Sequence, residues 1–280
     1  MAKPVFSGHE SFACKSHWLK RGYDFVESER NFNDEDAVLY LGVGKNMVAS
    51  IRFWLKAMGL LNENTLTPIA NYLFDNAEGK DPYLEDIGTL WLLHFSLVNV
   101  DYATIYKTVF VDYHHQRNVI EKNKLQNYIK HICFDETSYK KLYNENTVKR
   151  DIGVMLHNYC VKTNTNFEDS NTLFVPLNLI RELDKDVYVF NYQTRSEVPC
   201  LIFLYALLIQ FKGRNSISFE EITELSLIFC LTNNDLLEII KSLCNLYPSD
   251  IVFSDVAGIK ELQFHTELNP IEVLNRYYKA

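Results

Sequence analysis

Apolar residues recur every three or four positions between Lys45 and Met58, which predicts an amphipathic helix there. Its apolar stripe consists of Met47, Ile51, Trp54, Leu55 and Met58. A shorter helix is expected at 37–41, followed by the turn Gly42-Val43-Gly44, and residues 60–66 predict a small hairpin. Helix, glycine turn, helix and hairpin follow one another in the order of a winged helix-turn-helix.

The middle of the chain is expected to be mostly helical. Four helices are predicted, at residues 87–98, 102–110, 122–134 and 148–161. The polar stretch Thr163–Asn171 predicts a linker or a long loop. After it, a short helix is expected at Pro176–Leu183 and a strand at Val187–Tyr192.

The C-terminal part is expected to repeat the first plan. After a core helix at 201–211, Ser218 and Glu221 have the spacing of a capping box at the start of the next helix. Another helix is predicted at 235–246, and residues 251–264 predict a β-hairpin wing. The predicted class is therefore mainly α with small β-hairpins (α+β), with winged helix-turn-helix units joined by a helical middle region. The expected domains are residues 1–80, 81–162 and 163–280.

The composition excludes disorder as the main state, because 47% of the 280 residues are hydrophobic and the formal net charge is only -8. The longest apolar run, Cys200–Ile209, is too short to span a bilayer, and the N-terminus has no apolar signal-peptide core. Six scattered cysteines without C-x-x-C spacing are expected to be free thiols. We therefore expect a cytoplasmic protein.

The charge is unevenly distributed along the chain. Residues 1–60 carry a net charge of +1 and residues 107–150 carry +4, whereas residues 61–106 carry -6 and residues 151–280 carry -7. The acidic blocks would repel DNA from most of the surface and leave the other two segments as the docking route. Composition therefore restricts where a polyanion could lie without excluding one.

A basic face is expected on the helix at 45–58. Lys45, Ala49, Arg52 and Lys56 share one side of it, opposite the apolar stripe. Lysine and arginine pair with phosphate or guanine, and asparagine pairs with adenine. The predicted DNA contacts are Lys45, Asn46, Ser50, Arg52 and Lys56, with Lys15 as a further phosphate contact. The alternative is an ordinary solvated helix face.

Two further segments could carry hydrolytic chemistry. His9, beside Glu10, could act as a general base, or the segment could be a capped turn whose aromatic residues pack. The residues that could ligate a divalent metal are Asp81, Glu85, Asp86 and His94. These acids could equally complement a helix dipole. A standard nuclease motif is not visible in the sequence.

Four long strings together resemble the bacterial domain-of-unknown-function 4007 family. They are Phe6-Ser-Gly-His-Glu-Ser-Phe12, Trp18-Leu-Lys-Arg-Gly-Tyr23, Leu41-Gly-Val-Gly-Lys-Asn-Met-Val48 with Ser50-Ile-Arg52, and Asp81-Pro-Tyr-Leu-Glu-Asp followed by Gly88-Thr-Leu-Trp-Leu-Leu-His94. Lys149-Arg150-Asp151 and Pro176-Leu177 fit the later part of the family. The resemblance therefore covers almost the whole chain.

This resemblance implies a role in DNA phosphorothioation and anti-phage defence. The implied partners are a cysteine desulfurase, an ATPase and a sulfurtransferase resembling phosphoadenosine-phosphosulfate reductase. One member type, the B protein of the single-strand phosphorothioation system, is a DNA nicking endonuclease whose nick would permit sulfur insertion. On that basis His9 and Glu10 become the catalytic candidates. Asp81, Glu85, Asp86 and His94 become candidate ligands of Mg²⁺ or Mn²⁺.

Three hypotheses about function stay open at this point. The chain could be a metal-dependent nicking component, a non-catalytic winged-helix subunit that binds double-stranded DNA and recruits the sulfurtransferase, or a transcriptional regulator. The absence of a standard nuclease motif favours the second. A homodimer is a further expectation, because the second winged-helix unit lacks an evident nucleic-acid face.

Overall fold

The computed structural model describes residues 6–135, 143–160, 172–193, 195, 197–256 and 258–279. The chain divides into two compact units, residues 1–190 (unit 1) and 191–280 (unit 2). In the described residues it is mainly helical with three small antiparallel sheets, as predicted at that level. The predicted linker at Thr163–Asn171 lies outside the described residues, and the three expected domains stay a prediction.

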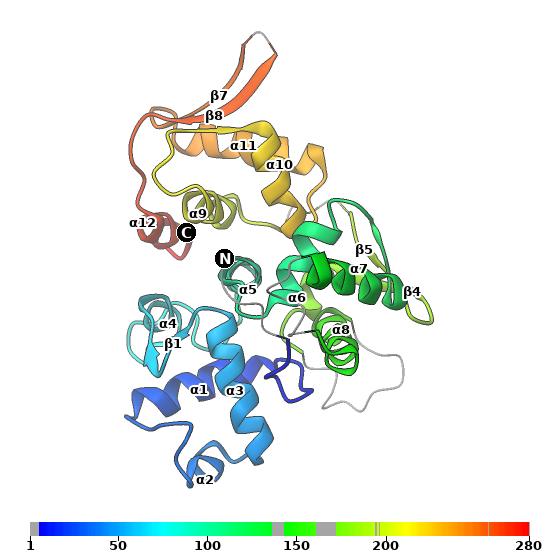
Figure 1. Cartoon of the computed structure of the whole chain (residues 1–280). Coiled ribbons are helices and arrows are strands. Elements are labelled where there is room, and N and C mark those ends of the chain that lie inside the picture. The colour runs from blue at the N-terminus through cyan, green and yellow to red at the C-terminus, as the bar shows by residue number, and fades with distance from the viewer. Residues whose placement is uncertain are drawn as a thin grey trace. The chain divides into compact units, whose positions relative to one another are not determined.

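The N-terminal part of unit 1 has the predicted order of elements (Figure 1). These are α1 (Ser16–Glu27), α2 (Ala37–Leu41), α3 (Lys45–Ala57), β1 (Leu61–Asn62), β2 (Thr65–Leu66) and α4 (Pro68–Phe74). Gly42 ends α2 with a left-handed φ of 59°, a conformation that glycine adopts without a Cβ clash. Thr67 caps α4 and Pro68 opens it, at a position where the missing N–H costs nothing.

Helices α1 and α3 pack closely because Gly22 lies between them. A Cβ on Gly22 would come within 2.7 Å of Ile51 Cγ2 and 2.8 Å of Leu55 Cδ1. Trp18 of α1 and Trp54 of α3 are both fully buried. The apolar stripe of α3 therefore faces the core, as its spacing predicts, and the basic face points outward.

The rest of unit 1 surrounds α5, which is apolar on every side and almost entirely buried. The elements are α5 (Ile87–Val100), α6 (Thr104–Lys107), the π-helical segment η1 (Thr108–Tyr113), β3 (Val119–Glu121), α7 (Lys122–Asp135), α8 (Glu145–Tyr159), the 3₁₀ turn η3 (Val175–Leu177), β4 (Ile180–Asp184) and β5 (Val187–Phe190). The strands form an antiparallel sheet in the order β3-β5-β4.

One predicted element of unit 1 is wrong. Residues 176–183 do not form a short helix: only η3 is helical, and Asn178 then turns the chain with a left-handed φ of 48°. The residues that follow pair with β5 instead, with Ile180 opposite Phe190. Both members of this pair, Ile180 and Phe190, are buried.

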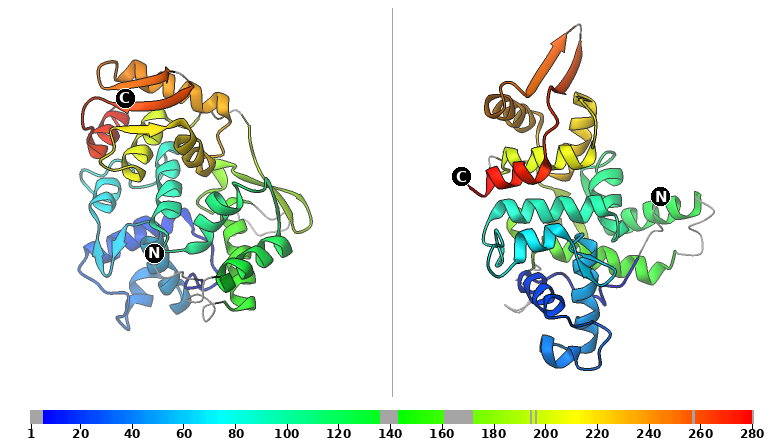
Figure 2. Two further views of the ribbon diagram at one scale, coloured as in Figure 1. Left: turned by 45° about the horizontal axis from the view of Figure 1, so that its top comes forward. Right: turned by 90° about the vertical axis from the view of Figure 1, so that its left-hand side faces the viewer.

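Unit 2 contains the predicted helices and hairpin (Figure 2). Its elements are α9 (Cys200–Gln210), β6 (Ser216–Ser218), α10 (Phe219–Ile228), α11 (Asn233–Leu246), β7 (Ile251–Val256), β8 (Ile259–Phe264) and α12 (Pro270–Tyr277). Ser218 and Glu221 form the predicted capping box of α10. Strands β7 and β8 form a long hairpin whose last pair is Val256 opposite Ile259.

Buried Arg195 anchors the entry to unit 2. Its Nε donates to the Cys230 carbonyl at 3.3 Å, and its other guanidinium nitrogens reach the Asn191 carbonyl and the Glu197 carboxylate. None of the six cysteines, all of which lie in the described residues, forms a disulfide. Among the helices that the structure describes, none is both long and apolar enough to cross a membrane.

Candidate functional site

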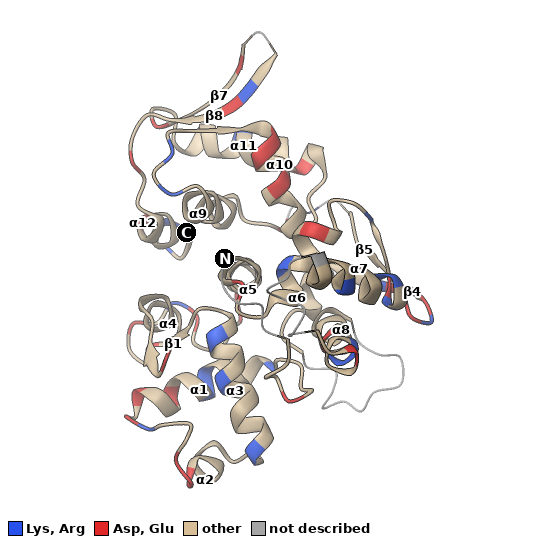
Figure 3. Cartoon of the chain, viewed as in Figure 1, with Lys and Arg blue, Asp and Glu red and all other residues tan. Residues whose placement is uncertain are grey.

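The basic side of α3 lines an open groove of about 720 Å³ in unit 1. Lys45 is exposed at the start of the helix, while Arg52 and Lys56 are half-buried further along. Figure 3 shows lysine and arginine positions spaced along α3. Asp34 and Glu35, from the loop before α2, also line the groove. A polyanion could therefore contact the α3 wall but would be repelled by the loop wall.

Arg52 is held by neutral partners, so its charge is not compensated. Its two terminal nitrogens donate to the side-chain oxygens of Asn33 at 3.0 Å and Asn64 at 2.7 Å. Burial and the nearby Arg52 lower the pKa of Lys56. Among the described residues, no ion pair involves Lys45, Arg52 or Lys56. Three cations thus line the groove without an ion pair to a described carboxylate, although Asp34 and Glu35 lie on the opposite wall and Glu63 acts on Lys56 through space.

The other predicted DNA contacts differ in exposure and in position relative to the groove. Asn46 is exposed beside Lys45, as expected. Ser50 is fully buried, because it precedes Trp54 by one helical turn and so faces the core. Its Oγ has no hydrogen-bond partner among the described residues. Lys15 is the N-cap of α1 and does not line the groove; its backbone bridges to Thr172. Ser50 therefore cannot contact DNA in this conformation.

His9 is paired with Asp151, a residue that the sequence did not indicate as its partner. Nε2 of His9 lies 2.9 Å from Oδ1 of Asp151, and both side chains are buried. The backbone N–H of Ser11 donates to Nδ1 of His9 at 3.1 Å, so Nε2 carries the proton and donates to the carboxylate. The backbone N–H of Ser7 also donates to Asp151.

This arrangement leaves His9 without a free ring nitrogen. A general base needs an unshared electron pair within reach of its substrate, and here Nδ1 already accepts a hydrogen bond. The ring also stacks on Trp54 and meets the edge of Phe53. Glu10 is exposed, and the hydrogen-bond partners of the His9 ring are Asp151 and Ser11 instead. In this conformation, His9 joins the N-terminal segment to α8.

The four predicted metal ligands do not form a metal-binding group. The carboxylate of Asp81 accepts the backbone N–H groups of Glu85 at 2.8 Å and Asp86 at 3.1 Å. Asp86 caps α5 through the N–H of Gly88 at 2.7 Å. His94 is fully buried, with Nδ1 2.8 Å from the Tyr159 hydroxyl. Over the described part of the chain, no three His, Cys, Asp or Glu side chains gather as metal ligands would.

Comparison with known proteins gives a family and two similar structures. The model of the family described as "Protein of unknown function (DUF4007)" matches residues 6–278. A crystal structure of SspB superposes with a TM-score of 0.86 at 25% identity, over 98% of this chain and 88% of that one. A magnesium-ion-bound SspB crystal structure superposes with a TM-score of 0.85 at 24% identity, over the same shares. No curated protein sequence matches the chain significantly.

Proposed function

The chain belongs to the DUF4007 family, and on this premise we propose that it is a DNA-binding component of a bacterial DNA phosphorothioation system. Its likeness to SspB, which we associate with that system, supports the assignment. We interpret α2, α3 and the β1–β2 hairpin as a winged helix in which α3 contacts double-stranded DNA. The sulfurtransferase, ATPase and cysteine desulfurase of the system would then be its protein partners.

The observation that carries this proposal is the row of unpaired cations on α3. Among the described residues Lys45, Arg52 and Lys56 form no ion pair, and the terminal nitrogens of Arg52 are held by neutral asparagine side chains, so the three cations remain available to an anion. Phosphate contacts of this kind release counterions from DNA and supply most of the sequence-independent affinity. Asn46, exposed at the start of the same helix, can hydrogen-bond a base edge.

Binding is tested with a fluorescent DNA duplex and the double variant Lys45→Gln with Arg52→Gln. We expect affinity to fall and the slope of log affinity against log salt to become shallower by about two, one for each lost phosphate contact. Arg181→Gln, which removes an exposed arginine from β4, is the matched control. Unchanged affinity and slope in the double variant would overturn the assignment of α3.

Nicking of DNA is a second candidate function, favoured by one observation, the magnesium bound in a similar SspB structure. The catalytic candidates from the sequence are His9 and Glu10, and the occupied ring nitrogens of His9 mean that the N-terminal segment would have to rearrange first. The described residues offer no ready ligand group, so we derive no chemical step through a metal.

Nicking is tested by incubating the purified chain with supercoiled plasmid and Mg²⁺ or Mn²⁺. Open-circle product that disappears with EDTA would support it, and His9→Gln should then abolish the product. Intact plasmid at every metal concentration, with duplex binding preserved, would leave the role of a non-catalytic subunit that recruits the sulfurtransferase.

A further inference from the structure

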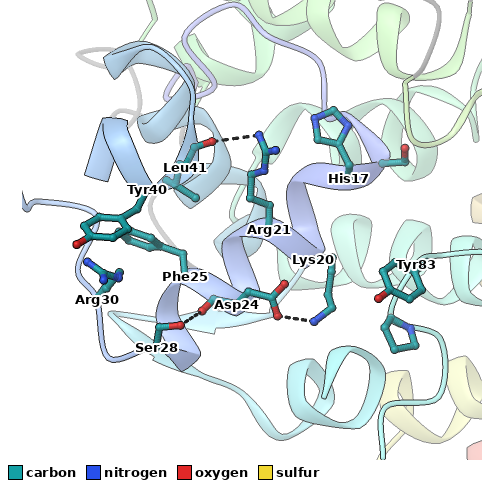
Figure 4. A pocket seen from close by; sticks show the side chains of 12 residues that line it. His17, Lys20, Arg21, Asp24, Phe25, Ser28, Arg30, Tyr40, Leu41 and Tyr83 are labelled. Carbon is teal, nitrogen blue, oxygen red and sulfur yellow. Dashed lines mark hydrogen bonds and ion pairs between the residues drawn. The ribbon is translucent and has the colours of Figure 1, made fainter. Parts of the chain in front are cut away.

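A second pocket of unit 1 lies between α1, α2 and the loop that precedes α5 (Figure 4). Its volume is about 430 Å³, within the range of roughly 300–1,000 Å³ that is usual for small-ligand sites. It shares no lining residue with the α3 groove. The two sites can therefore be altered separately.

The charge inside this pocket is positive. Lys20 and Asp24 pair with each other and cancel. Arg21 is exposed, and among the described residues its hydrogen bonding is limited to one terminal nitrogen, which donates to the Leu41 carbonyl at 3.0 Å. That bond orients the guanidinium and leaves its other N–H groups available for an anion. Arg30 adds a second guanidinium, 3.9 Å from the partly exposed carboxylate of Asp36.

Two of the side chains that line this pocket are tyrosines with unusually large exposed fractions. Tyr83 is 74% exposed and Tyr40 is 56% exposed, although large aromatic side chains are normally well covered. The guanidinium of Arg30 lies over the Tyr40 ring at 3.1 Å from its centroid. Figure 4 shows Tyr40 with Arg30 at one end of the pocket and Tyr83 at the other, with Arg21 between them.

Tyr83 is held in this position by the turn that Asp81 builds. The Asp81 carboxylate accepts two backbone N–H groups of that turn, and Leu84 adopts a left-handed φ of 58°. A non-glycine residue with positive φ is costly and needs such support. The structure thus maintains an exposed ring beside a cationic pocket.

We propose that this pocket binds a nucleotide, with the phosphate on Arg21 and the base against Tyr83. Guanidinium groups are the preferred protein ligands of phosphate, and an exposed tyrosine offers a face on which any base can stack. An unpaired DNA strand and a free mononucleotide present this same chemistry. The inference does not depend on α3 binding duplex DNA, because the two sites have no residue in common.

His17, which also lines the pocket, supplies a direct reporter of binding. Burial, together with the nearby Arg21 and Lys15, lowers its pKa. A phosphate bound to Arg21 would offset those positive charges and raise the pKa of His17. The test follows the His17 imidazole signal by NMR while the full chain is titrated with deoxyadenosine monophosphate.

We expect saturable shifts of the His17 signal, with binding at least about tenfold weaker for adenosine or inorganic phosphate alone. Arg21→Gln and Tyr83→Ser should each weaken binding about tenfold, whereas Tyr83→Phe, which keeps the ring, should bind as the parent does. Arg181→Gln is the matched control for a lost exposed arginine. Because Tyr83 and Arg21 are exposed, these variants should fold.

The source of the nucleotide is identified with a single-stranded oligodeoxynucleotide of about eight residues. Binding at least about tenfold tighter than the mononucleotide assigns the pocket to an unpaired DNA strand, and equal binding assigns it to a free nucleotide. The Lys45→Gln, Arg52→Gln variant should keep mononucleotide binding even where it loses duplex binding. Absence of binding, or binding unchanged by both Arg21→Gln and Tyr83→Ser, would overturn the proposal.

Discussion

The imidazole of His9 and the carboxylate of Asp151 meet at 2.9 Å although the residues are 142 positions apart in the chain. The pair is buried, and the Ser7 N–H donates to the same carboxylate. Together these bonds fasten the N-terminal segment to α8. Gly8 belongs to the same junction: its φ is +103°, and a Cβ there would lie 2.7 Å from the Phe53 ring.

This junction predicts a large loss of stability in Asp151→Ala. The change leaves the buried ring N–H of His9 and the part-buried backbone N–H of Ser7 without their acceptor, which should cost about 3 kcal/mol of unfolding free energy. Urea denaturation measures it, with Glu10→Ala as the control, since Glu10 is exposed and should change stability by less than about 0.5 kcal/mol. Equal stabilities for the two variants would contradict a structural role for the pair.

For a substitution at Ser50 we predict a change in the free energy of unfolding that is opposite in sign to that of Asp151→Ala. Its buried hydroxyl has no hydrogen-bond partner among the described residues, so Ser50→Ala removes a desolvated polar group at little loss of packing. We expect the free energy of unfolding to stay equal or to rise by about 1 kcal/mol. Ser226→Ala is the comparison, because the buried Ser226 hydroxyl does donate, to the Thr223 carbonyl at 2.7 Å. Urea denaturation of both variants should show that Ser226→Ala is less stable than Ser50→Ala. A loss of stability in Ser50→Ala would contradict the prediction.

Local patterns in the sequence predict the helices well and the site poorly. The spacing of Met47, Ile51 and Trp54 is a local signal, and α3 begins and ends within a residue of the prediction. The partner of His9 could not be predicted, because nothing in the spacing of residues relates position 9 to position 151. The helix predicted at 176–183 was wrong for a similar reason, because β4 forms through its pairing with β5.

The metal-ligand prediction illustrates the same limit. Asp81, Glu85 and Asp86 have a spacing that suits either a metal or a turn, and the sequence left both open. In the structure Asp81 uses its carboxylate on backbone N–H groups, and Asp86 caps a helix. Whether these carboxylates form a metal site or stabilise a turn depends on where the chain turns between α4 and α5. The identities of the single residues do not determine the position of that turn.

Asp81→Ala is therefore predicted to destabilise the turn beneath Tyr83. Two backbone N–H groups lose their acceptor, at a cost of about 2 kcal/mol. Glu85→Ala removes a neighbouring exposed carboxylate and should be nearly neutral. Thermal or urea denaturation in EDTA is the measurement, because a role in the turn is independent of metal. A loss of stability seen only when Mg²⁺ is present would instead favour a ligand.

The pH dependence of unit 2 should depend in part on Glu221. Hydrogen bonds from Arg214 and from Ser218 lower the pKa of Glu221 from 4.5 to about 2. A carboxyl group whose folded-state pKa is depressed contributes stability above its unfolded pKa and loses it as pH falls through the folded pKa. Stability should therefore decline between about pH 5 and pH 2.

Glu221→Gln removes this titration, so its stability should fall less steeply over the same interval. The control is Glu224→Gln, which removes an exposed carboxylate from the same helix, α10. Urea denaturation of the three proteins across the interval is the measurement. Parallel pH profiles for the parent and Glu221→Gln would show that the capping box and its arginine do not set this dependence.

Two neighbouring residues at the start of α3 should affect DNA binding in different ways. If Lys45 makes the phosphate contact that we propose, Lys45→Gln should lower affinity alike for all duplex sequences and decrease the salt slope by about one. If Asn46 makes the base-edge contact that we propose, Asn46→Ala should reduce discrimination between sequences by about 1–3 kcal/mol with little change in salt slope. Competition binding with a pool of duplexes measures both, with Lys212→Gln as the control for an exposed lysine elsewhere. If Lys45→Gln altered sequence preference and Asn46→Ala altered only the salt slope, the two roles assigned along α3 would be reversed.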